Sequence, residues 1–232
     1  MRLVVFDVDG TLVDSQHLIV AAQREAFAAH GLEPPSRERS LSIVGLSLAE
    51  AFTALVGAHG PVEGLVTAYK EAFRRMRSDP ACHEPFFPGA ADLVADLARQ
   101  RGVALGIATG KSRRGVAHLV ERHGWSRIFA TIQTANDAPS KPDPAMLDQA
   151  MAETGAAPGD TVMIGDSTFD MLMARAAGVK AIGVSWGYHP VAPLKEAGAA
   201  AIVHSNDELR TALARLGAWP LSPKIQASPI SQ

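Results

Sequence analysis

Two aspartates near the N-terminus, Asp7 and Asp9, have the spacing and the setting of a catalytic carboxylate pair. They follow the apolar run 3–6, which has the composition of a buried parallel strand, and Gly10 favours a break in that strand. Because ligands bind at the carboxyl ends of strands in open α/β sheets, both acids are available for chemistry. One carboxylate can attack phosphorus while a second transfers a proton. We therefore predict Asp7 as the nucleophile and Asp9 as the acid/base, with helix capping as the alternative role.

Two later segments repeat the pattern of a strand followed by polar residues. Thr109 and Gly110 follow the apolar run 103–108, and a hydroxyl beside free backbone N–H groups can bind phosphate oxygens there. Lys141 precedes a helix that Pro144 is suited to open, so a stiff loop would hold the lysine in place. The alternatives are an ordinary helix N-cap for Thr109 and a solvated surface charge for Lys141.

A further segment carries Asp166 after the apolar run 161–164, with Asp170 four residues on. That spacing predicts that the two acids share a helix face. Acids that crowd the site of Asp7 and Asp9 would repel one another strongly unless a cation lay between them. Oxygen ligands with an open position for phosphate suit Mg²⁺, so the sequence predicts a magnesium site.

Taken in order, these segments resemble the four sequence motifs of the haloacid dehalogenase (HAD) superfamily of phosphatases. The corresponding residues are 7–11 for the first motif, Thr109 and Gly110 for the second, Lys141 for the third, and Gly165 and Asp166 with Asp170 for the fourth. The resemblance covers about residues 2–190. It implies a hydrolase, a phosphatase that acts on a phosphomonoester through an aspartyl-phosphate intermediate.

The resemblance also implies a role for each motif residue. Asp7 would be phosphorylated, and Asp9 would transfer the proton. Thr109 and Gly110 would hold the phosphoryl group, and Lys141 would neutralise the charge of the nucleophile and the phosphate. The implied cofactor is Mg²⁺, held by the Asp7 carboxylate, the Asp9 main-chain carbonyl and Asp166, with Asp170 as nearby acidic support.

Residues 15–87 show only helical periodicity, which predicts an inserted α-helical cap. Apolar stripes with helical spacing run over 48–56 and 66–76. The place and length of this insertion resemble the helical cap of the phosphoglycolate phosphatase-like branch. A cap that closes over the site implies a small substrate, such as a phosphoglycolate-like compound or a sugar phosphate. The candidate specificity residues are His17, Arg24, Gly45, Leu46 and Ser47, with a plain helix–helix turn in which Ser47 is the N-cap as the alternative for residues 45–47.

The rest of the chain predicts an α/β fold, a doubly wound parallel sheet of Rossmann-like type. Strand-like runs alternate with helical ones after residue 88, at 103–108, 128–132, 161–164, 181–184 and 201–203. Residues 1–14 and 88–216 would form this catalytic core, with hinges near Asp14 and 85–89. Residues 217–232, rich in proline and serine, would form an extended tail.

Composition indicates a cytoplasmic enzyme with no nucleic acid and no membrane involved, and the resemblance implies that its partner is a small phosphorylated metabolite. The 232 residues, 47% of them hydrophobic, can bury a large core, and a net charge of −2 gives no nucleic-acid footprint. Cys82 is the only cysteine, so no intramolecular disulfide can form. The chain enters its first strand without a signal peptide, and its apolar runs are too short to span a membrane. The sequence leaves the oligomeric state open.

Three other functions use similar residues. A dehalogenase of the same superfamily needs no metal and no acid at the place of Asp9, so Asp9 and Asp166 argue against it. A sugar phosphomutase typically carries a cap histidine five residues beyond the acid that corresponds to Asp14, where this chain has Ile19, and His17 is two residues away. A non-enzymatic receiver domain has neither a second acid two residues after its phospho-acceptor nor a large helical insertion. A phosphatase is the preferred hypothesis.

Overall fold

The computed structural model describes residues 1–79, 82 and 84–217. Within this part of the chain, six strands form one parallel sheet in the order β3-β2-β1-β4-β5-β6. The strands are β1 (Arg2–Phe6), β2 (Val103–Thr109), β3 (Phe129–Thr134), β4 (Thr161–Gly165), β5 (Lys180–Val184) and β6 (Ala201–Val203). The predicted doubly wound parallel sheet is confirmed. Each predicted strand is present, with ends that differ by a residue or two.

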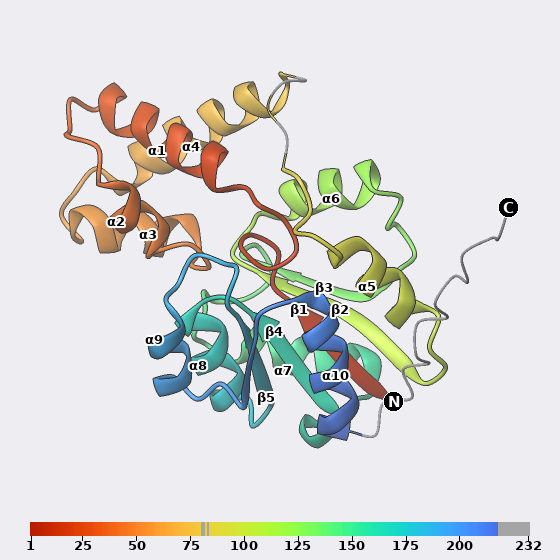
Figure 1. Ribbon diagram of the computed structural model, residues 1–232. Coiled ribbons are helices and arrows are strands. Elements are labelled where there is room, and N and C mark those ends of the chain that lie inside the picture. The colour runs from red at the N-terminus through yellow and green to blue at the C-terminus, as the bar shows by residue number, and fades with distance from the viewer. Residues whose placement is uncertain (80–81, 83, 218–232) are drawn as a thin grey trace, which may run out of the picture.

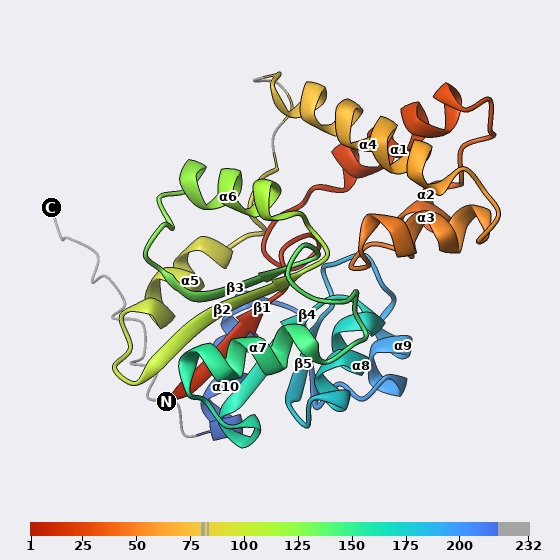
Figure 2. The same ribbon diagram turned by 180° about the vertical axis from the view of Figure 1, so that it is seen from behind.

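Helices cover both faces of the sheet (Figures 1 and 2). One layer consists of α5 (Ala90–Ala98), α6 (Arg113–Arg122) and α10 (Asn206–Gly217), and the other of α7 (Ala145–Thr154), α8 (Thr168–Ala176) and α9 (Val191–Glu196). A 3-10 turn, Pro158–Asp160, precedes β4. Alternate residues of β1 serve the two layers, because side chains of a strand point to opposite faces. Val4 and Phe6 belong to the first core, and Leu3 and Val5 to the second.

Between β1 and α5 the chain forms four helices that lie beyond the carboxyl end of β1 (Figure 1). They are α1 (Gln16–Ala29), α2 (Arg37–Leu41), α3 (Leu48–Val56) and α4 (Val62–Arg77). The predicted apolar stripes over 48–56 and 66–76 fall on α3 and α4. These helices share an apolar cluster of their own, centred on Phe27, Phe52 and Leu65, which is separate from the two clusters of the sheet. Hydrophobic burial therefore supports this helical unit independently of the sheet.

Two adjacent segments link the helical unit to the sheet. Val13 and Phe86 form an antiparallel bridge, the Asp14 N–H donates to Pro85 O (2.8 Å), and the Phe87 N–H donates to Leu12 O (3.0 Å). The outgoing and returning chains thus hydrogen-bond to each other where hinges were predicted. No described helix is long and apolar enough to cross a membrane. Most of the predicted tail, from 218 onward, lies outside the described residues, while Gly217 ends α10.

Candidate active site

Asp7 follows β1 directly and is buried, with 1% of its surface exposed. Its backbone continues the strand pairing, because its N–H donates to Ile164 O (2.9 Å). The next residues form a tight turn in which the N–H groups of Leu12 and Val13 both reach Val8 O. This turn excludes the alternative of a helix capped near residue 11, since α1 begins only at residue 16.

The residue after Asp9 must be a glycine for two reasons. Gly10 has φ +86°, which disfavours any residue with a side chain, and a Cβ here would lie 2.2 Å from Oδ2 of Asp166. The close approach brings the first turn against the acid that follows β4. Thr11, the next residue, donates its hydroxyl to Oδ1 of Asp166 (3.0 Å). The first and fourth motifs therefore contact each other directly, although 155 residues separate Thr11 from Asp166.

Lys141 is a buried cation between two carboxylates, not a surface charge. Its Nζ lies 3.0 Å from Oδ1 of Asp7 and 2.6 Å from Oδ1 of Asp170, and it is 1% exposed. Burial alone would lower the pKa of Lys141, but the charges of Asp170 and Asp7 outweigh burial and raise it. The lysine is therefore charged and fixed beside the carboxylate of Asp7.

Asp170 reaches the site through a helix cap. The predicted face shared by Asp166 and Asp170 is wrong, because Asp166 precedes α8 and Ser167 is its N-cap. The Asp170 side chain turns back so that its Oδ2 accepts from the Ser167 N–H (3.0 Å) and hydroxyl (2.7 Å). This reciprocal capping box points Oδ1 of Asp170 at Lys141.

Three carboxylates converge at this point, since one oxygen each of Asp7, Asp166 and Asp170 lies within 4.8 Å of the other two. Burial raises the pKa of Asp7 to about 7; Lys141 opposes this rise, and Asp170 and Asp9 add to it. Burial, followed by the charges of Asp7 and Asp170, also raises the pKa of Asp166 well above its usual value. A divalent cation bound here would reduce the electrostatic repulsion among the three carboxylates.

The residues present fit Mg²⁺. Oδ2 of Asp7 is buried and has no hydrogen-bond partner among the described residues, so one hard oxygen ligand is free. Both oxygens of Asp166 are held in place, Oδ1 by the Thr11 hydroxyl and Oδ2 by the Tyr188 N–H (2.8 Å). Asp170 is engaged on both oxygens by Lys141 and Ser167. A magnesium ion would therefore find its side-chain ligands in Asp7 and Asp166, with Asp170 acting through Lys141.

Thr109 ends β2 beside β1, and it is buried. It is not a helix cap, because α6 begins at residue 113 with Ser112 as its N-cap. The Thr109 hydroxyl accepts from the Lys111 N–H (3.2 Å). At Gly110 a Cβ would lie 2.4 Å from Leu46 O, so only glycine lets the cap loop come this close.

Lys111 is a functional candidate that sequence reasoning missed. Its Nζ lies 2.9 Å from Oδ1 of Asp9 and 2.7 Å from Oε1 of Glu84, and its side chain is 8% exposed. Asp9 also accepts from the Ser15 hydroxyl at the same oxygen (2.6 Å). Burial alone would lower the pKa of Lys111, but Asp9 and Glu84 outweigh burial and raise it, which keeps the amine charged. The lysine next to the second motif was the available signal, whereas nothing in the sequence pointed to Glu84.

The loop after β5 is also part of the site, although the sequence assigned no role to it. Its Trp186 donates from Nε1 to Thr11 O (3.1 Å), and its Tyr188 N–H donates to Asp166. The Tyr188 hydroxyl accepts from the Ser15 N–H (2.9 Å), at the start of the helical unit. The loop thus contacts the first motif, the fourth motif and the outgoing linker.

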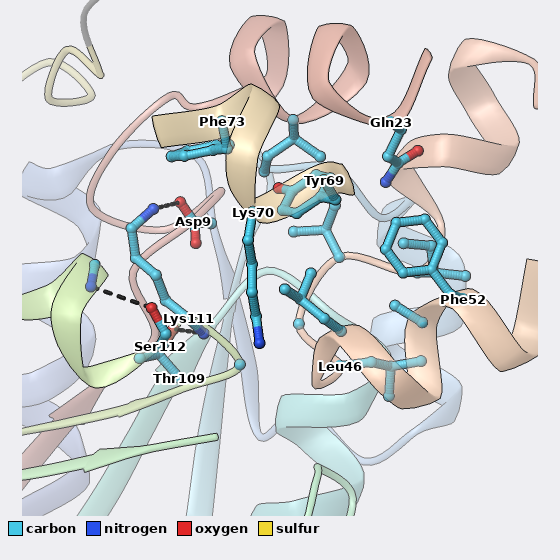
Figure 3. Close-up of a pocket in the computed structure, with 18 of the residues that line it drawn as sticks. Asp9, Gln23, Leu46, Phe52, Tyr69, Lys70, Phe73, Thr109, Lys111 and Ser112 are labelled. Carbon is cyan, nitrogen blue, oxygen red and sulfur yellow. Dashed lines mark hydrogen bonds and ion pairs between the residues drawn. The ribbon is translucent and has the colours of Figure 1, made fainter. Parts of the chain in front are cut away.

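A cavity of about 430 Å³ opens from the carboxylates toward the helical unit (Figure 3). Asp7, Asp9, Thr109 and Gly110 line its sheet end, and the predicted specificity residues Gly45 and Leu46 line it from the cap, next to Gly110. The third residue of that loop, Ser47, donates its N–H to Oγ of Ser140 (2.8 Å), the residue that precedes Lys141 in the sequence. Ser47 also caps α3, so the loop is a helix–helix turn and faces the site as well.

The two other predicted specificity residues lie elsewhere. His17 and Arg24 line a second hollow with Arg37 and Met76, and neither lines the cavity formed by the described residues. Ile19 does line the cavity. By the resemblance, that is the position at which a sugar phosphomutase would carry its cap histidine.

Comparisons with known proteins show which proteins this chain is similar to in sequence and in fold. Residues 4–184 match the family model of the haloacid dehalogenase-like hydrolases. The chain is 35% identical to a protein of Dickeya dadantii named "Probable phosphatase IndB", over 99% of this chain and 98% of that protein. It is also 35% identical to a phosphoglycolate phosphatase of Pseudomonas fluorescens, over 90% of this chain and 77% of that protein. A crystal structure of a hydrolase from Pseudomonas syringae superposes with a TM-score of 0.82 at 26% identity, covering 93% of this chain and 99% of that one.

Proposed function

The chain belongs to the haloacid dehalogenase-like hydrolase family and is a phosphatase, and on that premise we propose that it hydrolyses a small phosphomonoester with Mg²⁺ through an aspartyl phosphate on Asp7. The observation that carries this proposal is the state of the Asp7 carboxylate. Its Oδ2 is buried at the end of the cavity without a hydrogen bond from any described residue, and Lys141 lies beside Oδ1. A carboxylate that is desolvated and fixed in place is suited to attack phosphorus.

Two steps follow from this arrangement. In the first, an Asp7 oxygen forms a bond to phosphorus while the bond from phosphorus to the substrate oxygen breaks, and Asp9 gives its proton to the leaving oxygen. In the second, Asp9 takes a proton from water, whose oxygen attacks phosphorus and releases phosphate and free Asp7. The contacts of Asp9 with Ser15 and Lys111 both involve Oδ1. The other oxygen of Asp9, Oδ2, accepts no hydrogen bond from the described residues, and we assign proton transfer to it.

The negative charge on the phosphoryl group has to be stabilised by several groups of the site. When bound, Mg²⁺ would neutralise part of the charge on the carboxylates and on the phosphoryl oxygens. Asp7 and Asp166 are the side chains suited to hold it, and the Asp9 main-chain carbonyl is carried over from the family resemblance. Lys141 supplies a fixed positive charge in a water-poor site, where such a charge is worth most. The Thr109 hydroxyl and the Gly110 backbone at the end of β2 would bind the phosphoryl oxygens.

We propose that residues 15–87 act as the cap and that the cap selects the substrate. The cap-side cations that line the cavity come from α4, namely Lys70, Arg74 and Arg77. The cap loop at Gly45 and Leu46 lies against Gly110, and this close approach supports selection by the wall of the cavity. Since relatives are named phosphoglycolate phosphatases, 2-phosphoglycolate is the first compound to test.

The alternative functions fit less well. A phosphomutase would need a cap acid/base where Ile19 lines the cavity. A receiver domain would keep its aspartyl phosphate, whereas Asp9 lies beside Asp7 to assist its hydrolysis. A dehalogenase would have no use for the carboxylates that converge on Asp7. The partner we propose is therefore a small phosphorylated metabolite.

The proposal is tested by phosphate release from a panel of small phosphomonoesters, each with excess chelator and after Mg²⁺ is restored. We expect turnover only with the metal, and we expect Asp166→Asn to need far more Mg²⁺ for the same rate. Thr168→Ala, in the same turn but without a carboxylate, is the matched control. Full turnover in excess chelator would refute the metal-dependent mechanism.

A further inference from the structure

We propose that the leaving group of the substrate is an apolar group about the size of an aromatic ring, with a hydrogen-bond donor at its far end. This inference rests on the proposed phosphatase function and adds the class of substrate. It is carried by the half of the cavity that faces away from the carboxylates.

The cavity as a whole is larger, and its cap side more apolar, than a two-carbon acid requires. The cavity of about 430 Å³ lies within the range of roughly 300–1,000 Å³ found for pockets that enclose drug-sized ligands. Its cap side is built from apolar side chains of α1, α3, α4 and the loop before α3. They are Ile19, Ile43, Val44, Leu46, Leu48, Ala51, Phe52, Tyr69 and Phe73. Contact with such a wall favours a leaving group that removes apolar surface from water.

Gln23 is a buried polar side chain within this apolar wall. Gln23 lines the cavity and is 3% exposed; its Nε2 donates to Ser40 O (3.4 Å), but its Oε1 has no partner in the described structure. Figure 3 shows Gln23 beside Phe52, across the cavity from Asp9 and Thr109. A buried acceptor without a donor is costly, and a ligand N–H or O–H at this end would satisfy it.

The cations of the cavity are poorly placed for a small carboxylate. Lys111 is buried, but it already lies between Asp9 and Glu84. Lys70 and Arg74 line the cavity but are exposed, and Arg77, the last residue of α4, is half-buried, so all three remain in contact with water, where a cation contributes little to binding an anion. The side chains that would enclose the leaving group are thus the apolar ones and Gln23.

The experiment compares four alkyl phosphates, so that the alcohols leave with similar ease. They are ethyl phosphate, 2-phenylethyl phosphate, 2-(4-hydroxyphenyl)ethyl phosphate and 2-phosphoglycolate. We expect kcat/KM for the 2-phenylethyl compound to exceed that for ethyl phosphate by at least about tenfold, because several ring carbons enter the apolar pocket. The hydroxyphenyl compound should be better again by a few-fold or more, because its O–H can reach Gln23.

Variants locate these gains within the cavity. Leu48→Ala should reduce the ratio of kcat/KM between 2-phenylethyl and ethyl phosphate. Leu55→Ala should not, since Leu55 is on the same helix and similarly half-buried but does not line the cavity. Gln23→Leu should remove the advantage of the hydroxyl group while the advantage of the ring remains. Because each ratio compares kcat/KM for two substrates of the same variant, a loss of folded enzyme lowers both values alike and leaves the ratio unchanged.

Two outcomes would overturn the inference, and they differ from each other. If 2-phosphoglycolate were hydrolysed best and the phenyl ring gave no advantage over ethyl phosphate, the proposed function would stand and the inference on substrate class would be wrong. If none of the four compounds nor any other phosphomonoester released phosphate, the proposed function itself would fail, and the inference would fail with it.

Discussion

The two ends of the cavity differ in chemistry: the sheet end is charged and hydrogen-bonded, and the cap end is mostly apolar. At the sheet end, Asp7, Lys141 and the acids of the 166–170 turn come from three separate segments. Lys141 pairs with Asp7 and Asp170, and hydrogen bonds from Thr11 and Ser167 hold Asp166 and Asp170 in place. At the cap end, the wall is mostly apolar, and Oε1 of the buried Gln23 has no hydrogen-bond partner among the described residues. The first arrangement fixes atoms for one reaction, and the second provides a surface that suits a particular leaving group. The difference suggests that chemistry and choice of substrate can be changed separately.

The largest effect at the sheet end is expected from Lys141→Ala. The variant should lose at least about 100- to 1,000-fold in kcat, because it removes a fixed charge next to the transferring group. It also leaves two buried carboxylates uncompensated, which should lower the free energy of unfolding by about 3–5 kcal/mol. Rates are therefore measured per folded molecule, with the folded fraction taken from circular dichroism. Lys195→Ala, a lysine of α9 that does not line the cavity, is the control. A rate near that of the wild type would contradict the role given to Lys141.

A smaller effect is expected from Lys111→Met, which removes one of the two contacts of Asp9 Oδ1 and keeps the one with Ser15. Because Asp9 would no longer be held in position, kcat should fall by up to about 100-fold. The loss should be greater for an alkyl phosphate, whose alcohol needs a proton to leave, than for 4-nitrophenyl phosphate. A purely structural role would lower both rates alike. Glu84→Gln, which retains a polar partner for Lys111, should lose less than Lys111→Met.

The smallest effect is expected at the contact between cap and core. Ser140→Ala removes the hydroxyl that accepts from the Ser47 N–H. A single hydrogen bond contributes about 0.5–1.5 kcal/mol, so KM should rise a few-fold while kcat stays close to that of the wild type. Ser42→Ala is the matched control, because the Ser42 hydroxyl donates within the cap, to Arg39 O. Equal effects of the two variants would indicate that the cap–core contact does not help substrate binding.

The sequence predicted the sheet end better than the cap end, for a physical reason. Strands and the turns that end them are local, so the places of Asp7, Thr109 and Asp166 at strand ends could be derived from short patterns. Parallel pairing then brings those ends to one edge of the sheet. The place of the Asp170 carboxylate could not be derived in this way, because it depends on a side chain turned back to cap α8.

The missed and misplaced residues depend on contacts between distant parts of the chain. Glu84 meets Lys111 only because the returning linker lies beside the outgoing one, which no local pattern encodes. Tyr188 reaches Asp166 from the loop after β5 for a similar reason. His17 and Arg24 were selected for their charge, but the rotation of α1 turns them to another hollow and leaves Ile19 and Gln23 on the cavity.

The central claim, that Asp7 carries the phosphoryl group, is tested most directly by mass spectrometry of the Asp9→Asn variant mixed with 4-nitrophenyl phosphate and Mg²⁺. This substrate leaves without a proton, so the first step should proceed, while the second should stall because Asn cannot activate water. We expect the mass of one phosphoryl group on the peptide that contains Asp7, and its loss when Asp7→Asn is added to the variant. A phosphoryl group on another residue, or turnover at the wild-type rate by Asp7→Asn alone, would contradict the account.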